Sequence, residues 1–121
     1  MTMPTVLRIY IAGPYTAGDV AMNVRQAVLA GLEIHRAGHV PFIPHLFHFA
    51  HYLCPQDYAV WCALDLQWLQ ACHGVLRLPG ESPGADREVE FAKTLGLAIY
   101  YSLPVCLEAL PMQEVAHVHL A

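Results

Sequence analysis

Two acidic residues fall where the hydrophobic pattern predicts the buried faces of helices. On a helix over 85–95, Glu88 lies at the centre of a small and apolar face, with charged residues opposite. On a helix over 55–72, Asp65 lies in the same way among aromatic, cysteine and leucine side chains. An unpaired charge on a buried face is costly, so such a carboxylate usually has a partner or a chemical role.

Two carboxylates that meet in one cleft can divide the work of breaking a glycosidic bond. One protonates the leaving group, and the other stabilises or attacks the anomeric carbon, because positive charge develops on the sugar. A structural alternative is that one of the acids forms an ion pair with Arg77 or caps a loop, as many buried charges do. The sequence pattern leaves both interpretations open.

Short strand-like segments alternate with helix-like segments along the chain. Strands are expected over 6–12, 39–43, 74–78 and 97–101, and helices over 20–37, 55–72 and 85–95. Asp19 and Ser82 are expected to cap the first and last of these helices, with Pro83 at the first helical position. Residues 45–55 are expected to form a loop or one irregular turn, and 104–121 a short final helix and tail.

This alternation predicts a parallel sheet with helices on both faces, because parallel strands are joined by right-handed helical crossovers. We therefore expect an α/β fold, a flavodoxin-like three-layer sandwich with four to five strands. It should be a single domain over 1–121, with its catalytic core over about 6–103. In such folds the loops after the strands form the ligand crevice. The loops gathered there would be 13–18, 45 onward and 79–84.

The composition narrows the classes of partner. A net charge of -4 argues against a nucleic-acid polymer. Hydrophobic residues make up 56% and charged residues 13% of the 121 residues, which predicts a homo-oligomer, dimer or higher. Ala59, Val60 and Ala63 would lie on the outer face of their helix.

The cysteines and the lengths of the apolar runs indicate where in the cell the protein is expected. Four cysteines show no Cys-x-x-Cys spacing, and no secretory leader is evident, so we expect reduced thiols in the cytoplasm. No apolar run reaches the length needed to span a bilayer, so no membrane partner is expected.

Three motifs carry a family resemblance. They are Tyr10-Ile11-Ala12-Gly13-Pro14-Tyr15, Asp65-Leu66-Gln67-Trp68-Leu69-Gln70-Ala71 and Ser82-x-Gly84-x-x-x-Glu88-x-x-x-Ala92. Over about residues 7–101 the chain resembles the nucleoside 2-deoxyribosyltransferase family, and especially its branch of deoxynucleoside 5'-monophosphate N-glycosidases. The resemblance implies an enzyme of N-glycosidic bonds in nucleosides or their 5'-monophosphates, with 2'-deoxyribose as the expected sugar and another base or water as its acceptor.

The resemblance also implies roles for single residues. Glu88 matches the nucleophile that forms a covalent glycosyl ester, Asp65 the acid near the base or sugar hydroxyls, and Tyr10 the tyrosine that orients the nucleophile. Gly13 and Tyr15 match residues of the first loop that line the nucleotide.

The remaining motif residues match the part of the site that holds the 5' end of the sugar. These are Ser82 and Gly84. Nucleoside-specific members carry an acid where Ser82 stands, and a neutral Ser suits a monophosphate better because an acid would repel it. They also carry an asparagine near the C-terminus that completes a neighbouring subunit's site, whereas the chain's only Asn is Asn23.

Other interpretations come from the histidines and from the fold. His45, His48, His51 and Cys54 recur at every third position, which raises a zinc-dependent hydrolase as an alternative. Standard zinc spacings are not matched, and on a helix the first and last would lie 180° apart. We therefore expect no metal or other cofactor, with His45 and Phe47 lining the base pocket and the others at the surface or an interface. A non-catalytic nucleotide sensor of the same fold is a further alternative.

Overall fold

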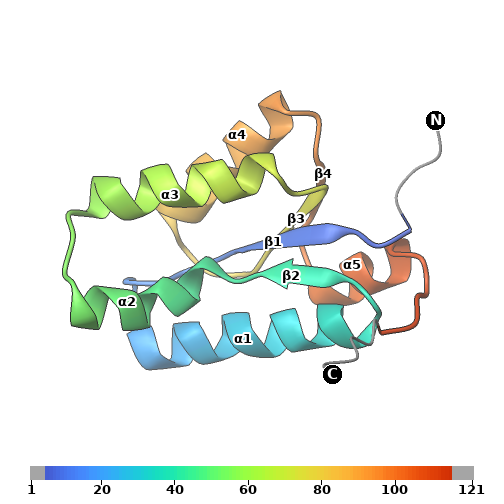
Figure 1. The fold of residues 1–121 in the computed structure, drawn as a ribbon, viewed down its shortest axis with the longest axis horizontal. Coiled ribbons are helices and arrows are strands. Elements are labelled where there is room, and N and C mark those ends of the chain that lie inside the picture. The colour runs from blue at the N-terminus through green and yellow to red at the C-terminus, as the bar shows by residue number, and fades with distance from the viewer. Residues whose placement is uncertain (1–4, 116–121) are drawn as a thin grey trace, which may run out of the picture.

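The structure, a computed structural model, describes residues 5–115 and has a four-stranded parallel sheet at its centre. Its strands, in the spatial order β2-β1-β3-β4, are β1 (Arg8–Ala12), β2 (Val40–Phe42), β3 (Gly74–Arg77) and β4 (Ala98–Tyr100). One face is covered by α1 (Val20–Arg36) and α5 (Leu103–Ala109), the other by α3 (Tyr58–Gln70) and α4 (Pro83–Thr94) (Figure 1). The predicted flavodoxin-like α/β sandwich is therefore confirmed.

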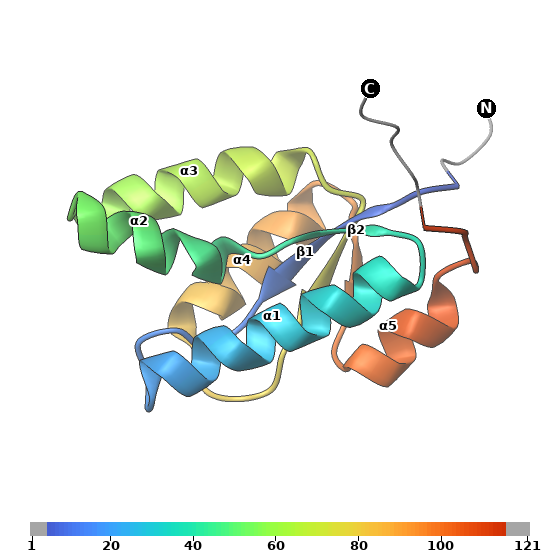
Figure 2. The same cartoon turned by 60° about the horizontal axis from the view of Figure 1, so that its bottom comes forward.

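The central strand β1 serves both cores by the alternation of its side chains. Ile9 and Ile11 enter the core shared with α1 and α5, which lie on one side of the sheet in both views (Figure 2). Tyr10 and Ala12 enter the opposite core, with residues of α3 and α4. Tyr10 is fully buried there. The alternation thus places a tyrosine hydroxyl on the face where Asp65 and Glu88 stand.

Local capping explains where the helices begin. The Asp19 side chain accepts a hydrogen bond from the backbone N–H of Met22 at 3.0 Å, as predicted for the start of α1. Ser82 caps α4 with Pro83 at the first position, also as predicted. Helix α3 begins at Tyr58 rather than at residue 55, because Asp57 is its extended N-cap residue.

The prediction of a loop over 45–55 is wrong. A 3-10 turn (Pro44–Leu46) runs into α2 (Phe47–Leu53), which packs beside the sheet's β2 end (Figure 1). Pro44 suits the first turn of a helix, and no Gly or Pro follows it before Pro55. The segment mixes His with aromatic residues, so its sequence shows no clear apolar stripe of helical spacing. In the structure, none of the α2 residues is fully buried.

The helices and the exposed residues bear on the expected membrane and oligomer partners. No helix within residues 5–115 has both the length and the apolar character of a membrane span. Ala59, Val60 and Ala63 are exposed on α3, as predicted. The homo-oligomer itself stays a prediction.

Gly38→Ala is expected to lower the free energy of unfolding by about 2 to 4 kcal/mol. The new side chain would have to adopt a left-handed backbone conformation, and its Cβ would also clash with a neighbouring segment. Gly38 has a φ of 89°, and a Cβ there would lie 2.3 Å from the carbonyl oxygen of Gln113. The control Gly96→Ala also has a positive φ, 73°, but nothing within 4 Å of the added Cβ. It should lose only about 1 to 2 kcal/mol. Urea unfolding of both variants tests this. Equal losses of unfolding free energy in the two variants would show that the contact with Gln113 adds nothing to the cost.

Candidate active site

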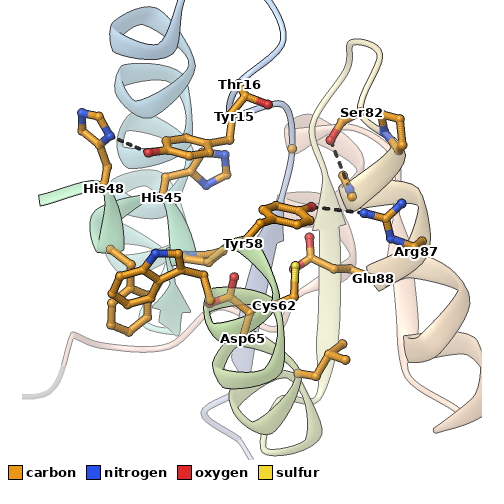
Figure 3. Close-up of a pocket in the computed structure, with 18 of the residues that line it drawn as sticks. Tyr15, Thr16, His45, His48, Tyr58, Cys62, Asp65, Ser82, Arg87 and Glu88 are labelled. Carbon is orange, nitrogen blue, oxygen red and sulfur yellow. Dashed lines mark hydrogen bonds between the residues drawn. The ribbon is translucent and has the colours of Figure 1, made fainter. Parts of the chain in front are cut away.

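A cavity of about 950 Å³ opens at the carboxyl ends of the strands, where the crevice was expected. Its size lies within the range of small-molecule sites. The loop after β1, the segment from Pro44 through α2, and the facing parts of α3 and α4 form its walls (Figure 3). Of the eight predicted site residues, seven line this cavity: Gly13, Tyr15, His45, Asp65, Ser82, Gly84 and Glu88. The eighth, Tyr10, lies behind it and reaches it through a hydrogen bond.

Glu88 projects from α4 into the cavity, next to the buried side of that helix. The hydroxyl of Tyr10 donates a short hydrogen bond to its Oε2 atom. Burial raises the pKa of Glu88 to about 7, although the Tyr10 hydrogen bond and the charges of Arg77 and Arg87 oppose the rise. Near neutral pH, Glu88 therefore exists in both protonation states, and its ionised form has a fixed orientation.

Asp65 projects from α3 toward the same space (Figure 3). Its Oδ1 atom is buried and has no hydrogen-bond partner within the described residues. Burial, and next the negative charge of Glu88, raise the pKa of Asp65 to about 7. A carboxyl whose pKa is raised next to an ionised carboxylate can keep its proton near neutral pH, so that Asp65 can act as an acid while Glu88 acts as a base or nucleophile.

The structural alternative for Asp65 and Glu88 was an ion pair with Arg77. In the structure, Arg77 pairs with another acid. Arg77 donates to the carboxylate of Asp86 at 2.9 Å, on the outer side of α4. The same guanidinium donates to the backbone carbonyls of Leu78 and Gly80. No ion pair within residues 5–115 involves Asp65 or Glu88. Neither carboxyl is therefore neutralised by a structural cation.

The two glycines of the site allow close approaches to the cavity wall. A Cβ on Gly84 would lie 2.7 Å from the hydroxyl of Tyr58, so this position admits the tyrosine against the start of α4. A Cβ on Gly13 would lie 3.0 Å from Cβ of Leu78. The Ser82 hydroxyl oxygen accepts a hydrogen bond from the backbone N–H of Ala85 at 3.1 Å. The hydroxyl proton of Ser82 is therefore free to be donated to a ligand.

The interpretation of His48 and His51 as surface or interface residues is wrong, because both line the cavity with His45. His48 Nδ1 lies 2.5 Å from the hydroxyl of Tyr15, which links α2 to the first loop (Figure 3). His51 Nδ1 accepts the indole N–H of Trp61 at 2.9 Å, which links α2 to α3.

His45 is bound to the first loop as well. Its Nε2 atom donates to the carbonyl oxygen of Pro14 at 3.0 Å, and burial lowers its pKa, so the neutral ring is favoured. Within residues 5–115, no group of three or more His, Cys, Asp or Glu side chains is placed to hold a metal ion. The hydrogen bonds of His45, His48 and His51 connect the parts of the cavity wall.

The predicted site residues do not include several side chains that line the cavity: Tyr58, Trp61, Cys62, Arg87 and Phe91. The rings of Phe47 and Trp61 stack with centroids 5.7 Å apart, which gives this wall an aromatic surface. A signal existed for Tyr58, Trp61 and Cys62, because they share the helical face of Asp65. The signal for Arg87 was weaker: it follows the crevice loop over 79–84 in the sequence, but a helical wheel turns it away from the Glu88 face.

Comparisons with known proteins agree with the fold and define the family. The structure is similar to that of a 2-deoxyribosyltransferase from the psychrotolerant bacterium Bacillus psychrosaccharolyticus. The TM-score is 0.55 and the identity 18%, over 76% of this chain and 69% of that chain. No curated protein matches the sequence. The family model described as "Domain of unknown function (DUF7768)" matches residues 7–102, and the chain therefore belongs to the DUF7768 family.

Proposed function

We propose that the protein cleaves N-glycosidic bonds of nucleosides or their 5'-monophosphates and transfers the sugar to another base or to water. The observation that carries this proposal is the meeting of Asp65 and Glu88 in one cavity, each with a pKa raised to about 7. The similarity to a 2-deoxyribosyltransferase supports it at the level of the fold, and makes 2'-deoxyribose the expected sugar.

In the first half-reaction, the carboxylate of Glu88 attacks the anomeric carbon and forms a glycosyl ester. The bond between that carbon and the base nitrogen breaks, its electron pair goes to the base, and Asp65 gives the base a proton. The ionised Glu88 also stabilises the positive charge that the sugar develops before the ester forms. Tyr10 holds the carboxylate through its hydrogen bond, so that one oxygen is oriented and the other is free to attack.

In the second half-reaction, a nitrogen of an acceptor base or the oxygen of water attacks the same carbon. The ester bond to Glu88 breaks, the carboxylate is restored, and Asp65 takes up the proton that the acceptor releases. General acid and base help of this kind is worth about 10² to 10⁴ in rate. Transfer and hydrolysis share all these steps and differ only in the acceptor.

The residues at the two ends of the cavity indicate how a substrate would be oriented in it. The sugar must lie beside Glu88 and Asp65, so the base lies toward the aromatic and histidine wall of α2 and α3. His45, in the turn before α2, and Tyr15, in the first loop, line the same side of the cavity. Ser82 and Gly84 lie at the start of α4, near the 5' end of a sugar held in this way. These assignments need no metal and no organic cofactor.

A panel of nucleosides and 5'-monophosphates, with and without a free acceptor base, tests the proposal by chromatography. We expect the wild-type protein to release the base from at least one deoxy substrate, and to form a new nucleoside if transfer dominates. Binding of nucleotides without release of any base would instead indicate a sensor that uses the same cavity.

A further inference from the structure

The candidate active site contains a single permanently cationic side chain. The chain has six Lys and Arg residues, all within residues 5–115, and Arg87 is the one that lines the cavity. It directly precedes Glu88 in α4, and its charge is close enough to lower the pKa of that carboxyl. The proposed reaction has no step for this guanidinium.

The other arginine near the site, Arg77, is already occupied. Its guanidinium is bound to the carboxylate of Asp86 and to two backbone carbonyls, and it does not line the cavity. It holds the loop between β3 and α4 against the first turn of α4. Because its donors are used in this way, Arg77 is not available to a ligand.

Arg87, by contrast, has a weak and neutral partner. Its Nη2 atom donates to the hydroxyl of Tyr58 at 3.2 Å, and none of the ion pairs within residues 5–115 includes it. A guanidinium has five N–H donors in a planar fork that fits two oxygens of a carboxylate or phosphate. Most of these donors remain open to a ligand in the cavity.

The position of Arg87 shows which end of a substrate it would meet. Figure 3 shows the hydrogen bond that Arg87 donates to Tyr58, beside Glu88 in the first half of α4. The aromatic and histidine wall that would take the base is formed mainly by α2 and by Trp61. Since Glu88 has to reach the anomeric carbon, a group close to Arg87 belongs to the sugar and not to the base.

We propose that Arg87 selects substrates that carry a phosphate on the sugar, and that this phosphate replaces the hydroxyl of Tyr58 as the partner of Arg87. The inference rests on the proposed function and names its substrate class. A phosphate adds two negative charges close to Asp65 and Glu88, and Arg87 offsets part of that repulsion. A charged partner also binds a guanidinium more strongly than a phenol does.

The test compares kcat/KM for a nucleoside, its 5'- and 3'-monophosphates, and a nucleoside with a carboxylate on the base. The wild-type protein should prefer at least one of the sugar phosphates to the nucleoside. Arg87→Gln should reduce this preference by about 10- to 100-fold, the factor expected for loss of a charge-assisted hydrogen bond. Arg87→Lys should retain part of the preference, because it keeps the charge and loses the fork.

Two further variants separate charge from structure. Arg25→Gln removes one positive charge from the exposed side of α1, away from the cavity, and should keep the wild-type preference. Tyr58→Phe should also keep it, since Tyr58 is only the partner that the phosphate replaces. An unchanged preference in Arg87→Gln, equal losses on nucleoside and phosphates, or an Arg87-dependent preference for the base carboxylate would overturn the inference.

Failure of the proposed function is distinguishable from failure of this inference. If the wild-type protein releases no base from any substrate, the proposed function is wrong, and Arg87 is then tested by binding alone. Isothermal titration with nucleoside 5'- and 3'-monophosphates should still show about 10- to 100-fold weaker binding to Arg87→Gln than to Arg25→Gln. Equal affinities for these two variants would overturn the role of Arg87.

Discussion

Replacing Glu88 with glutamine is expected to abolish release of the base while substrate binding stays close to that of the wild type. The amide has nearly the same shape as the carboxylate and still accepts the hydrogen bond from Tyr10. It is not a nucleophile, and it carries no charge to stabilise the developing positive charge on the sugar. Loss of a nucleophile typically lowers kcat by about 10⁴- to 10⁶-fold.

The same helix offers a matched control. Glu90 is exposed, lies outside the cavity and forms a surface ion pair with Lys93 at 3.0 Å. Glu90→Gln makes the same chemical change two residues away, and should leave kcat and KM within about twofold of the wild type because surface ion pairs are weak. Chromatography measures turnover, and isothermal titration measures binding. A Glu88→Gln variant that is as active as Glu90→Gln would rule out the glycosyl ester at Glu88.

The sequence predicted the fold because its signals are local and agree with one another. Strand-like runs end at Gly or Pro, and helices begin at the capping residues Asp19 and Ser82, so each crossover could be recognised on its own. The two carboxylates were predictable for a related reason. A helical wheel shows which side chains share the buried face of a helix, and parallel strands bring the loops that follow them to one edge of the sheet.

The rest of the site depends on how the helices pack against one another, which no single-helix pattern contains. Tyr58 reaches Arg87 because α3 lies against α4 at the position where Gly84 has no side chain. The helix α2 was missed because its inner face meets a cavity instead of a core, and so carries histidines and aromatics in place of aliphatic residues. Residues that serve a cavity are therefore the ones that a search for apolar periodicity misses.

The pH dependence of activity follows from the two raised pKa values. Glu88 must be ionised to attack and Asp65 protonated to donate, and each has a pKa of about 7 against ordinary values of 4.5 and 3.8. The pair then carries one proton near neutral pH, and kcat/KM should follow a bell-shaped curve with its maximum near pH 7. Activity falls on the acidic side as Glu88 gains a proton, and on the alkaline side as Asp65 loses one.

Asp65→Asn is expected to lower kcat/KM by about 10² to 10⁴, the usual worth of a general acid, and to remove the alkaline limb of the curve. The acidic limb should remain, because Glu88 still has to be ionised. A sugar substrate with a leaving group that needs no proton, such as 4-nitrophenolate, should lose far less activity. Asp57→Asn is the matched control, since Asp57 is exposed just before α3 and does not line the cavity. An alkaline limb that survives in Asp65→Asn, with equal losses on both leaving groups, would mean that the base takes its proton from another donor.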